Sequence, residues 1–409
     1  MRYVGIDWAD THHDLCCVDE QGQKVSRLHI DNTREGLDKL LEYLKELGRQ
    51  AGGAECILIG IETSHLMLVD VLLNAGYSIY PLNPKAVDRY RDRYTTSGAK
   101  SDAFDAELIA QALRTDRDRF RKLMPDSELL RELRLLVHDQ RRFIRTQTLL
   151  GHQLRDSLKA YFPVAVDLFS DLTGPSALAF LAAYPKPGLI PVKKLEKLLR
   201  QARYPQPEKK AAQIVEQVRR GHIETNDFIV RAKSRAVVTL VEQLQTLRQR
   251  LDQYEKEIEA LFEKHPDASV IKSLPGSGPS NGPRLLIELG DNRQRYDNPD
   301  GLQCEAGTSP VTKASGNGRI VTVRRACRKS FRDAVHQFAF CSTNQSAWAK
   351  HFYQQQRARG NTNASALRAL GDKWLKIIYR LWKDRVPYDE NIFLAARTRQ
   401  AFHQVPVPA

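Results

Sequence analysis

Short apolar runs alternate with amphipathic stretches over the first hundred residues. Three consecutive runs have the length and alternation of strands, and the second and third are joined at Glu20-Gln21-Gly22. Later segments switch between helical periodicity and buried apolar runs. Strands are expected at 2–8, 14–19, 24–30, 56–61 and 77–82, and helices at 32–47, at 65–75 and from residue 84 onward. This order, βββαβαβα, predicts an α/β domain over residues 1–124.

The pattern then becomes that of long helices. Residues 128–162 contain no proline, and Ser127 offers a helix start. A second long helix has apolar residues at spacings that alternate between three and four, which is typical of a heptad seam. Its members are Val237, Leu240, Leu244, Leu247, Leu251, Tyr254, Ile258 and Leu261. We expect a coiled coil, either between these two helices or between protomers; the alternative is a core helix packed within its own domain.

These patterns divide the chain into four segments. After the α/β domain, residues 125–265 form coiled-coil helices around a proline-rich helical insertion at about 163–225. Residues 266–393 are expected to form a mainly helical C-terminal domain, and residues 394–409 a tail. The expected class is thus α/β plus α, and the βββαβαβα order of the first domain resembles the RNase H or RuvC-like fold.

Four carboxylates fall where a nuclease-type metal site needs them. Asp7 and Glu62 end two apolar strands, whereas Asp102 and Asp105 lie three apart on one face of a helix. Taken singly, each could be a turn former or could favour a helix dipole. Together they predict a site for Mg²⁺, which prefers oxygen ligands and serves phosphoryl transfer.

Positive charge predicts a nucleic-acid partner. The chain has 409 residues, with 63 Lys and Arg against 49 Asp and Glu, and a formal net charge of +14. From Asn317 to Arg332 no residue is acidic. The candidate contacts are Lys313, Arg319, Arg324, Arg325, Arg328, Lys329 and Arg332. A solvated surface is the alternative interpretation of such charges.

Two turns in the C-terminal region are candidate sites. The turn Gly276-Ser277-Gly278 precedes an apolar helix and resembles a helix-hairpin-helix, whose exposed amides can hold a phosphate. Ser315 precedes Gly316 on a loop near arginines, so it could be a nucleophile toward a phosphodiester. Serine and glycine are also ordinary turn residues, and the residue types alone favour a turn.

A rival interpretation of the first domain is an actin-like ATPase or sugar kinase, which also begins with a strand, an aspartate and a hairpin. Those proteins place small residues after the aspartate so that backbone amides approach phosphates. Here Trp8 follows Asp7, and no second phosphate loop is found.

Motifs along almost the whole chain resemble the insertion-sequence-110 family of DEDD transposases, which is related to Piv-type DNA invertases. These motifs are Gly-Ile-Asp at 5–7, Gly-Ile-Glu-Thr-Ser at 60–64, Asn-Pro at 83–84, Lys-Ser-Asp-Ala-Phe-Asp-Ala at 100–106, Leu-Pro-Gly-Ser-Gly-Pro at 274–279 and Ala-Gly-Thr-Ser-Pro-Val at 306–311. The resemblance implies an acidic tetrad at Asp7, Glu62, Asp102 and Asp105 and a nucleophilic serine at Ser315. It also implies a site to which both domains contribute, a covalent 5′-phosphoserine and a Holliday-junction intermediate.

The resemblance further implies a structured non-coding bridge RNA that pairs with donor and target DNA. We therefore expect a DNA recombinase dependent on Mg²⁺, or on Mn²⁺, that acts as a homodimer or tetramer joined through coiled coils. No signal peptide or membrane-spanning run is found, so a cytoplasmic protein is expected. The alternatives are a site-specific invertase, a RuvC-like junction endonuclease that needs no serine, and a nucleic-acid-binding module with an inert tetrad.

Overall fold

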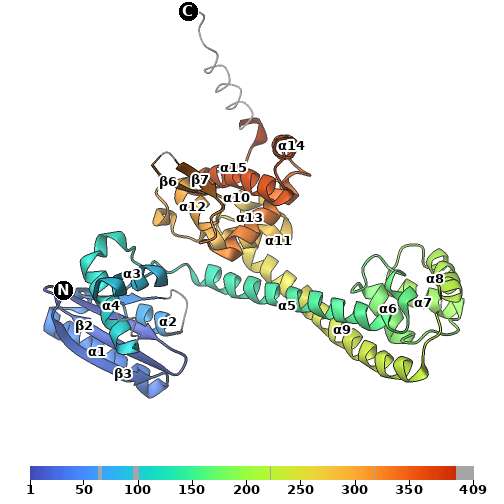
Figure 1. The fold of residues 1–409 in the computed structure, drawn as a ribbon, viewed down its shortest axis with the longest axis horizontal. Coiled ribbons are helices and arrows are strands. Elements are labelled where there is room, and N and C mark those ends of the chain that lie inside the picture. Colours follow the sequence, from blue (N-terminus) through green and yellow to red (C-terminus); the bar gives the residue numbers. More distant parts are fainter. Residues whose placement is uncertain (63–66, 95–100, 222, 317, 393–409) are drawn as a thin grey trace, which may run out of the picture. The chain divides into compact units, whose positions relative to one another are not determined.

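The computed structural model describes residues 1–62, 67–94, 101–221, 223–316 and 318–392, and the chain forms two compact units (Figure 1). The first unit spans residues 1–125 and the second residues 126–409. The tail expected at 394–409 lies outside the described residues, as do parts of the motifs at 60–64 and 100–106.

The first unit is built on a five-stranded sheet with the order β3-β2-β1-β4-β5. The chain's first three strands pair antiparallel, and β4 and β5 then add in parallel beside β1. The strands are β1 (Arg2–Trp8), β2 (His12–Val18), β3 (Lys24–Asp31), β4 (Ile57–Ile61) and β5 (Ser78–Pro81). The helices are α1 (Arg34–Ala51), α2 (Met67–Asn74), α3 (Pro84–Tyr94) and α4 (Asp102–Thr115), with short 3-10 helices η1 (Ala54–Cys56) and η2 (Arg117–Arg119). The expected order of elements and the mixed α/β class are confirmed.

Alternation along the strands gives the sheet two apolar faces. On one face Val4, Ile6, Ile59 and Ile61 pack with Leu40 of α1 in one core cluster. The opposite face carries a second cluster, in which side chains of β1, β2, β4 and β5 pack against α4. Helix α4 therefore covers the face on which the odd-numbered residues of β1 project.

The second unit begins with two long helices that run antiparallel along each other, α5 (Glu128–Lys159) and α9 (Asp227–Lys264) (Figure 1). The start of α5 shares a core with the end of α9, and the end of α5 shares another core with the start of α9. Their pairing within one chain agrees with one of the two arrangements expected from the heptad pattern. A supercoil of these helices and their pairing with a second protomer remain predictions.

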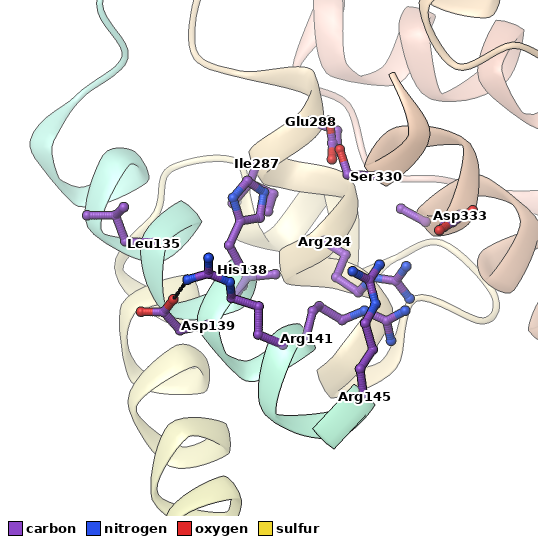
Figure 2. A pocket seen from close by; sticks show the side chains of 13 residues that line it. Leu135, His138, Asp139, Arg141, Arg145, Arg284, Ile287, Glu288, Ser330 and Asp333 are labelled. Carbon is purple, nitrogen blue, oxygen red and sulfur yellow. Dashed lines mark ion pairs between the residues drawn. The ribbon is translucent and has the colours of Figure 1, made fainter. Parts of the chain in front are cut away.

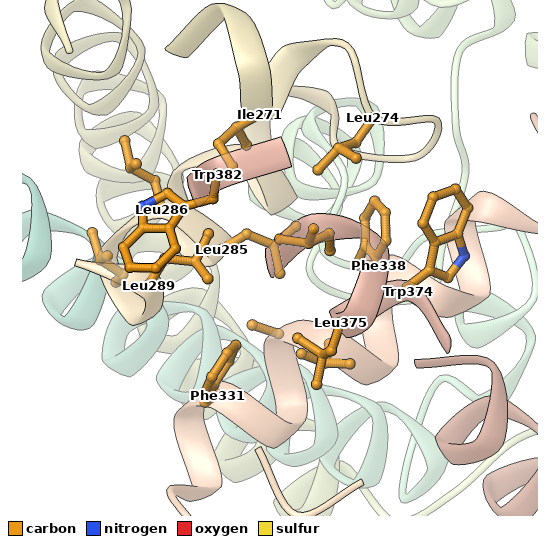
Figure 3. Packing of buried hydrophobic residues seen from close by; sticks show 14 of the residues in the cluster. Ile271, Leu274, Leu285, Leu286, Leu289, Phe331, Phe338, Trp374, Leu375 and Trp382 are labelled. Carbon is orange, nitrogen blue, oxygen red and sulfur yellow. The ribbon is translucent and has the colours of Figure 1, made fainter. Parts of the chain in front are cut away.

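The cores of the second unit form at the two ends of this helix pair. One joins η3 (Pro163–Val166), α6 (Pro175–Ala183), α7 (Val192–Gln201) and α8 (Pro207–Gly221) to the helix pair. The other contains Trp374 and Trp382, both fully buried (Figure 3). Its elements are α10 (Ala268–Lys272), α11 (Gly278–Leu289), η4 (Arg293–Arg295), α12 (Pro299–Glu305), α13 (Lys329–Ser342), α14 (Ala347–Ala358) and α15 (Asn363–Asp384). The remainder of the chain is mainly helical, as expected.

One element of the second unit differs from the expected loop around Ser315. Strands β6 (Val311–Ser315) and β7 (Gly318–Thr322) pair as an antiparallel hairpin. Thr, Val and Ile in these segments favour strands, but the flanking glycines and charges hid the pattern. None of the described helices combines the length and the hydrophobicity that a membrane span requires.

Candidate functional site

Two facing glycines bring α4 onto the sheet. Gly5 of β1 pairs with Gly60 of β4, and a methyl group at Gly5 would overlap the backbone of α4 at Ala106 and Ala110. A side chain at Gly60 would lie against Ile109 of the same helix. Because both strands lack side chains here, the helix backbone rests directly on them. Gly5, the first residue of the Gly-Ile-Asp motif that ends at Asp7, is thus required by packing.

The first turn of α4 is fixed by its cap. The Ser101 side chain accepts a hydrogen bond from the Phe104 backbone N–H at 3.3 Å. This cap starts the helix at Asp102, and the buried face that follows holds the helix on the sheet. The position of the Asp102 carboxylate therefore depends both on the cap and on the glycine contact.

Register places a further carboxylate beside Asp7. Asp14 of β2 is the direct cross-strand partner of Asp7, and His29 of β3 is the direct partner of Asp14. Directly opposite residues project to the same face of a sheet, and His12 shares that face because it is two residues from Asp14. All four side chains therefore project to the face that α4 covers.

Two of these groups, His12 and Asp14, form a candidate metal centre with Asp102 of α4. His12 Nε2 lies 3.3 Å from Asp102 Oδ2 and 3.9 Å from Asp14 Oδ2. The three possible ligand atoms lie within 4.8 Å of one another, and all three residues are partly or fully exposed to solvent. His29 Nδ1 lies 3.1 Å from Asp14 Oδ1, and the His29 ring lies next to the His12 ring in a tilted arrangement, with 5.1 Å between the ring centroids. Two carboxylates and an imidazole suit a divalent cation such as Mg²⁺ or Mn²⁺, although a protonated His12 would satisfy the carboxylates as an ion pair.

The four predicted carboxylates are placed unevenly. Asp7 and Glu62 follow the register pair Ile6 and Ile61 at the carboxyl ends of two parallel neighbours. Asp102 joins the candidate metal centre. Among the described residues, the cluster of three ligands within 4.8 Å contains only this member of the tetrad, so a four-carboxylate site remains a proposal.

Asp105 has a different environment from the other three. It is 4% exposed, and its Oδ1 accepts a hydrogen bond from Arg91 Nη2 of α3 at 2.6 Å. The hydrogen bond to Asp105 is the main cause of a raised pKa of the Arg91 guanidinium. Arg91 thus holds α3 to α4 through a carboxylate at the expected site.

Sequence reasoning missed His12, Asp14, His29 and Arg91. The signal for the first two was present: a two-residue turn at Asp10 and Thr11, closed by the hydrogen bond from the Ala9 N–H to the His12 carbonyl, makes Asp14 the partner of Asp7, and alternation then adds His12. His29 and Arg91 come from a third strand and from another helix, so no local spacing points to them.

Ser315 lies at the end of β6, next to the hairpin turn. It pairs with Gly318, and Gly316 in the turn has φ of +55°, which favours glycine. Ser315 is exposed, and its hydroxyl makes no hydrogen bond to the described part of the chain. Ser315 is therefore small and accessible, and no basic side chain of the described residues forms a hydrogen bond with it.

The two faces of this hairpin separate the nearby cations. Ser315, Lys313 and Ile320 share one face, because Lys313 pairs directly with Ile320. Arg319 pairs with Ala314 and projects from the opposite face. Within the hairpin, Lys313 therefore shares the face of Ser315, and the contact of Arg319 with a phosphate stays a prediction.

The other predicted contacts differ in their availability. Arg325 and Lys329 are exposed. Arg324 Nε donates a hydrogen bond to the Ser309 carbonyl at 3.2 Å, and Arg332 is half-buried beside Cys327 and Asp333. Their guanidinium groups retain further donors for an anion.

Arg328 is a structural cation. It forms an ion pair with Glu305 and another with Glu288, whose Oε2 lies 2.9 Å from Arg328 Nη1. Glu288 is 4% exposed, so its charge needs this partner. We therefore expect Arg328 to stabilise the fold rather than to contact a phosphate.

The glycine turn at 276–278 is held by internal contacts. The Gly276 N–H donates to Gln345 Oε1 at 2.7 Å, and a side chain at Gly276 would overlap the α13 backbone at Ser342. Its N–H is thus already hydrogen-bonded within the protein, and a phosphate contact of Gly276 stays a prediction. Gly278 is exposed and stays a candidate contact. Ser277, the polar residue of the turn, is buried, and its hydroxyl donates a hydrogen bond to the Lys272 carbonyl at 3.3 Å. This bond explains why a polar side chain is tolerated there.

Comparison with known proteins agrees with this organisation. The IS110 DEDD transposase family model matches residues 4–163, and the transposase model of the IS116/IS110/IS902 family matches residues 268–354. A mini-circle protein of IS117 from Streptomyces coelicolor, named as a transposase, is 32% identical over 399 residues, which is 95% of each chain. A protein of insertion element IS116 from Streptomyces clavuligerus is 26% identical over 391 residues, 94% of this chain and 95% of its own. This chain therefore belongs to the IS116/IS110/IS902 family of insertion-sequence transposases.

Proposed function

We propose that the protein cuts and rejoins DNA at the ends of its element with Ser315 as nucleophile and a divalent cation bound by the carboxylates of the first unit. The observation that carries this proposal is the cluster of Asp14, His12 and Asp102. Its member Asp14 lies directly opposite Asp7 in the sheet. Such an oxygen-rich group on one face of a mixed sheet supports a RuvC-like arrangement of the first unit.

The residues present fit a hard divalent cation. Asp7, Glu62, Asp102 and Asp105 are the proposed ligands, and the structure adds Asp14 and His12 beside Asp102. Mg²⁺ is proposed, and the imidazole of His12 would also suit Mn²⁺. The bound cation would neutralise charge that develops on a phosphate. The protein's own contribution is to hold the carboxylates in place through the contact of α4 with Gly5 and through the ion pair of Arg91 with Asp105.

The proposed bond changes involve Ser315 and one phosphodiester. The Ser315 oxygen forms a bond to phosphorus while the bond from phosphorus to the 3′ oxygen breaks. The serine proton leaves to solvent or to a base, and the departing oxygen takes a proton to become a 3′ hydroxyl. Because the 5′-phosphoserine keeps the energy of the broken bond, a different 3′ hydroxyl can attack it to join strands and release Ser315. Exchanges of this kind would pass through a Holliday junction.

Partners are proposed from charge and from the family. Lys313, Arg319, Arg324, Arg325, Lys329 and Arg332 supply cations for DNA backbones, with Gly278 as a further contact. A bridge RNA that pairs with donor and target DNA, a homodimer or tetramer joined through the long helices, and a cytoplasmic location complete the proposal.

Two alternatives differ in testable ways. The exposed Ser315 hydroxyl has no base beside it in the described residues, which leaves open a RuvC-like endonuclease that hydrolyses DNA without a serine. A site-specific invertase would share the serine and differ only in the arrangement of its DNA sites.

The test is recombination between donor and target plasmids with Mg²⁺, with and without the transcript of the element's non-coding end. We expect Ser315→Ala and Asp102→Ala each to abolish strand exchange, while Ser280→Ala, an exposed serine on α11, leaves it unchanged. Strand exchange that persists in Ser315→Ala would overturn the serine mechanism. Equal recombination without the transcript would contradict only the proposal that an RNA guides the reaction.

A further inference from the structure

A cavity of about 450 Å³ lies within the second unit, between α5, α11 and α13. Four arginines contribute to its lining: Arg141, Arg142 and Arg145 come from α5, and Arg284 comes from α11. Figure 2 shows the guanidinium groups of Arg141, Arg145 and Arg284 gathered on one side of the cavity, near Asp333.

Arg284 is the unusual member of this group. It is 7% exposed, and no carboxylate of the described residues forms an ion pair with it. A buried guanidinium is costly to desolvate and is normally paired with an anion. The structure instead surrounds it with two further arginines.

The acidic residues of the cavity do not balance this charge. Asp139 lies 3.7 Å from Arg142, and Glu288 lies 2.9 Å from Arg328. Asp333 lies beside the cluster, but it also lies 3.9 Å from Arg332. The carboxylates nearest the three guanidinium groups, Asp333 and Glu288, are therefore both shared with other arginines.

The charge on Arg284 persists at neutral pH. Burial lowers its pKa to about 10, with repulsion from Arg141 and Arg145 adding to the shift and attraction from Asp333 and Glu288 opposing it. A value near 10 leaves the group protonated at pH 7. Like charges thus remain together in a hollow that has room for an anion.

We propose that this cavity holds a backbone phosphate of a nucleic-acid strand, with Arg284 at its floor and Arg141 and Arg145 at its sides. Guanidinium groups match phosphate oxygens because they donate two parallel hydrogen bonds. The exposed Arg142 and Arg145 continue the positive surface along α5, which suits a strand that passes over the cavity better than a free anion. The identification of the polyanion as nucleic acid rests on the proposed function.

The test is binding of labelled single-stranded and duplex oligonucleotides to the full chain over a series of salt concentrations, with EDTA to prevent cleavage. We expect Arg284→Met to weaken binding about tenfold and to reduce the slope of log affinity against log salt by about one, the change for one lost phosphate contact. Arg284→Lys should keep the slope. Arg250→Met, an exposed position on α9, is the matched control and should change neither quantity.

Thermal unfolding separates this role from a structural one. Without nucleic acid, Arg284→Met should melt at or above the native temperature, because it removes a buried charge that lacks a full partner. A lower melting temperature with unchanged affinity would overturn the proposal and make Arg284 a structural cation. A different result would show that the cavity binds a free anion instead of a nucleic-acid strand. In that case inorganic phosphate would raise the melting temperature of the native chain more than chloride at equal ionic strength, and Arg284→Met would bind oligonucleotides as the native chain does. If the native chain bound no oligonucleotide, both proposals would fail, whereas lost cleavage with intact binding would count only against the proposed chemistry.

Discussion

Asp14 lies directly opposite Asp7 in the antiparallel pairing of β1 and β2. This register places a carboxylate that no sequence motif singled out on the same face as the first residue of the predicted tetrad. Through His12, Asp14 also lies in one cluster with Asp102 of α4. The centre proposed for the divalent cation therefore has contributors from the hairpin as well as from the expected strand ends and helix.

Asp14→Asn tests this contribution. The substitution keeps the size of the side chain but removes one negative charge and one strong oxygen donor. We expect the affinity for Mn²⁺ to fall about tenfold, within the range of effects for residues that support a metal site. Calorimetric titration of the full chain measures it, with Asp38→Asn on the exposed side of α1 as control. Equal affinities in Asp14→Asn and the native chain would remove Asp14 from the centre.

Gly5→Ala tests the seating of α4. A methyl group at Gly5 would overlap the helix backbone at Ala106, and backbone cannot move aside as a flexible side chain can. The free energy of unfolding of the first unit should fall by about 3 kcal/mol, and metal binding should weaken with it. Urea unfolding followed by circular dichroism measures the loss. Gly188→Ala, where a methyl group meets nothing within 4 Å, should be nearly neutral; a similar loss at both positions would refute the packing argument.

Arg328→Met distinguishes a structural cation from a DNA contact. The substitution leaves the carboxylates of Glu288 and Glu305 without their shared partner, and Glu288 is buried. We expect the free energy of unfolding to fall by about 2 to 4 kcal/mol because an unpaired buried charge remains. Oligonucleotide affinity of the folded fraction should be unchanged. An unaltered stability together with weaker binding would return Arg328 to the nucleic-acid contacts.

Asp291 gives the second unit a dependence on pH. Its carboxylate accepts the Ser127 N–H at 2.7 Å and lies 2.8 Å from His265 Nε2, which ties the start of α5 and the end of α9 together. Burial raises the pKa of Asp291, but the hydrogen bonds from His265 and Ser127 outweigh burial, so its pKa lies well below the usual range. Because the folded pKa is the lower one, the stabilisation is complete above the unfolded value of about 4 and is lost as pH falls below it.

Asp291→Asn should therefore lower the free energy of unfolding by about 1 to 2 kcal/mol at pH 7. The difference from the native chain should shrink as the pH is lowered from about 4. Chemical unfolding at several pH values measures this difference, with Asp252→Asn on the exposed surface of α9 as control. A difference that stayed constant down to pH 2 would rule out the ionised carboxylate as its source.

Periodicity and strand composition were sufficient to predict most elements. The limits of β1 agree with the predicted residues 2–8, and α5 starts at the predicted Glu128. The hairpin around Ser315 was missed because its strands are only five residues long and exposed, so they lack the alternation that burial imposes.

The candidate site was less predictable than the elements. Asp102 follows from helix start signals, whereas the ion pair of Arg91 with Asp105 joins two helices across the stretch 95–100 and no spacing rule anticipates it. Arg328 shows the opposite problem. It belongs to a basic run in the sequence, yet Glu288 and Glu305, distant along the chain, neutralise it in the fold.

The most direct measurement of the central claim is the chemical nature of the cleaved DNA end. Labelled element-junction DNA, the transcript of the element's non-coding end and Mg²⁺ are mixed with the full chain, and the products are separated under denaturing conditions. The account predicts a covalent protein–DNA adduct that peptide mapping places on Ser315 and that is lost in both Ser315→Ala and Asp102→Ala. Cleaved DNA without an adduct, formed equally well by Ser315→Ala, would contradict it and would make the protein a metal-dependent hydrolytic endonuclease.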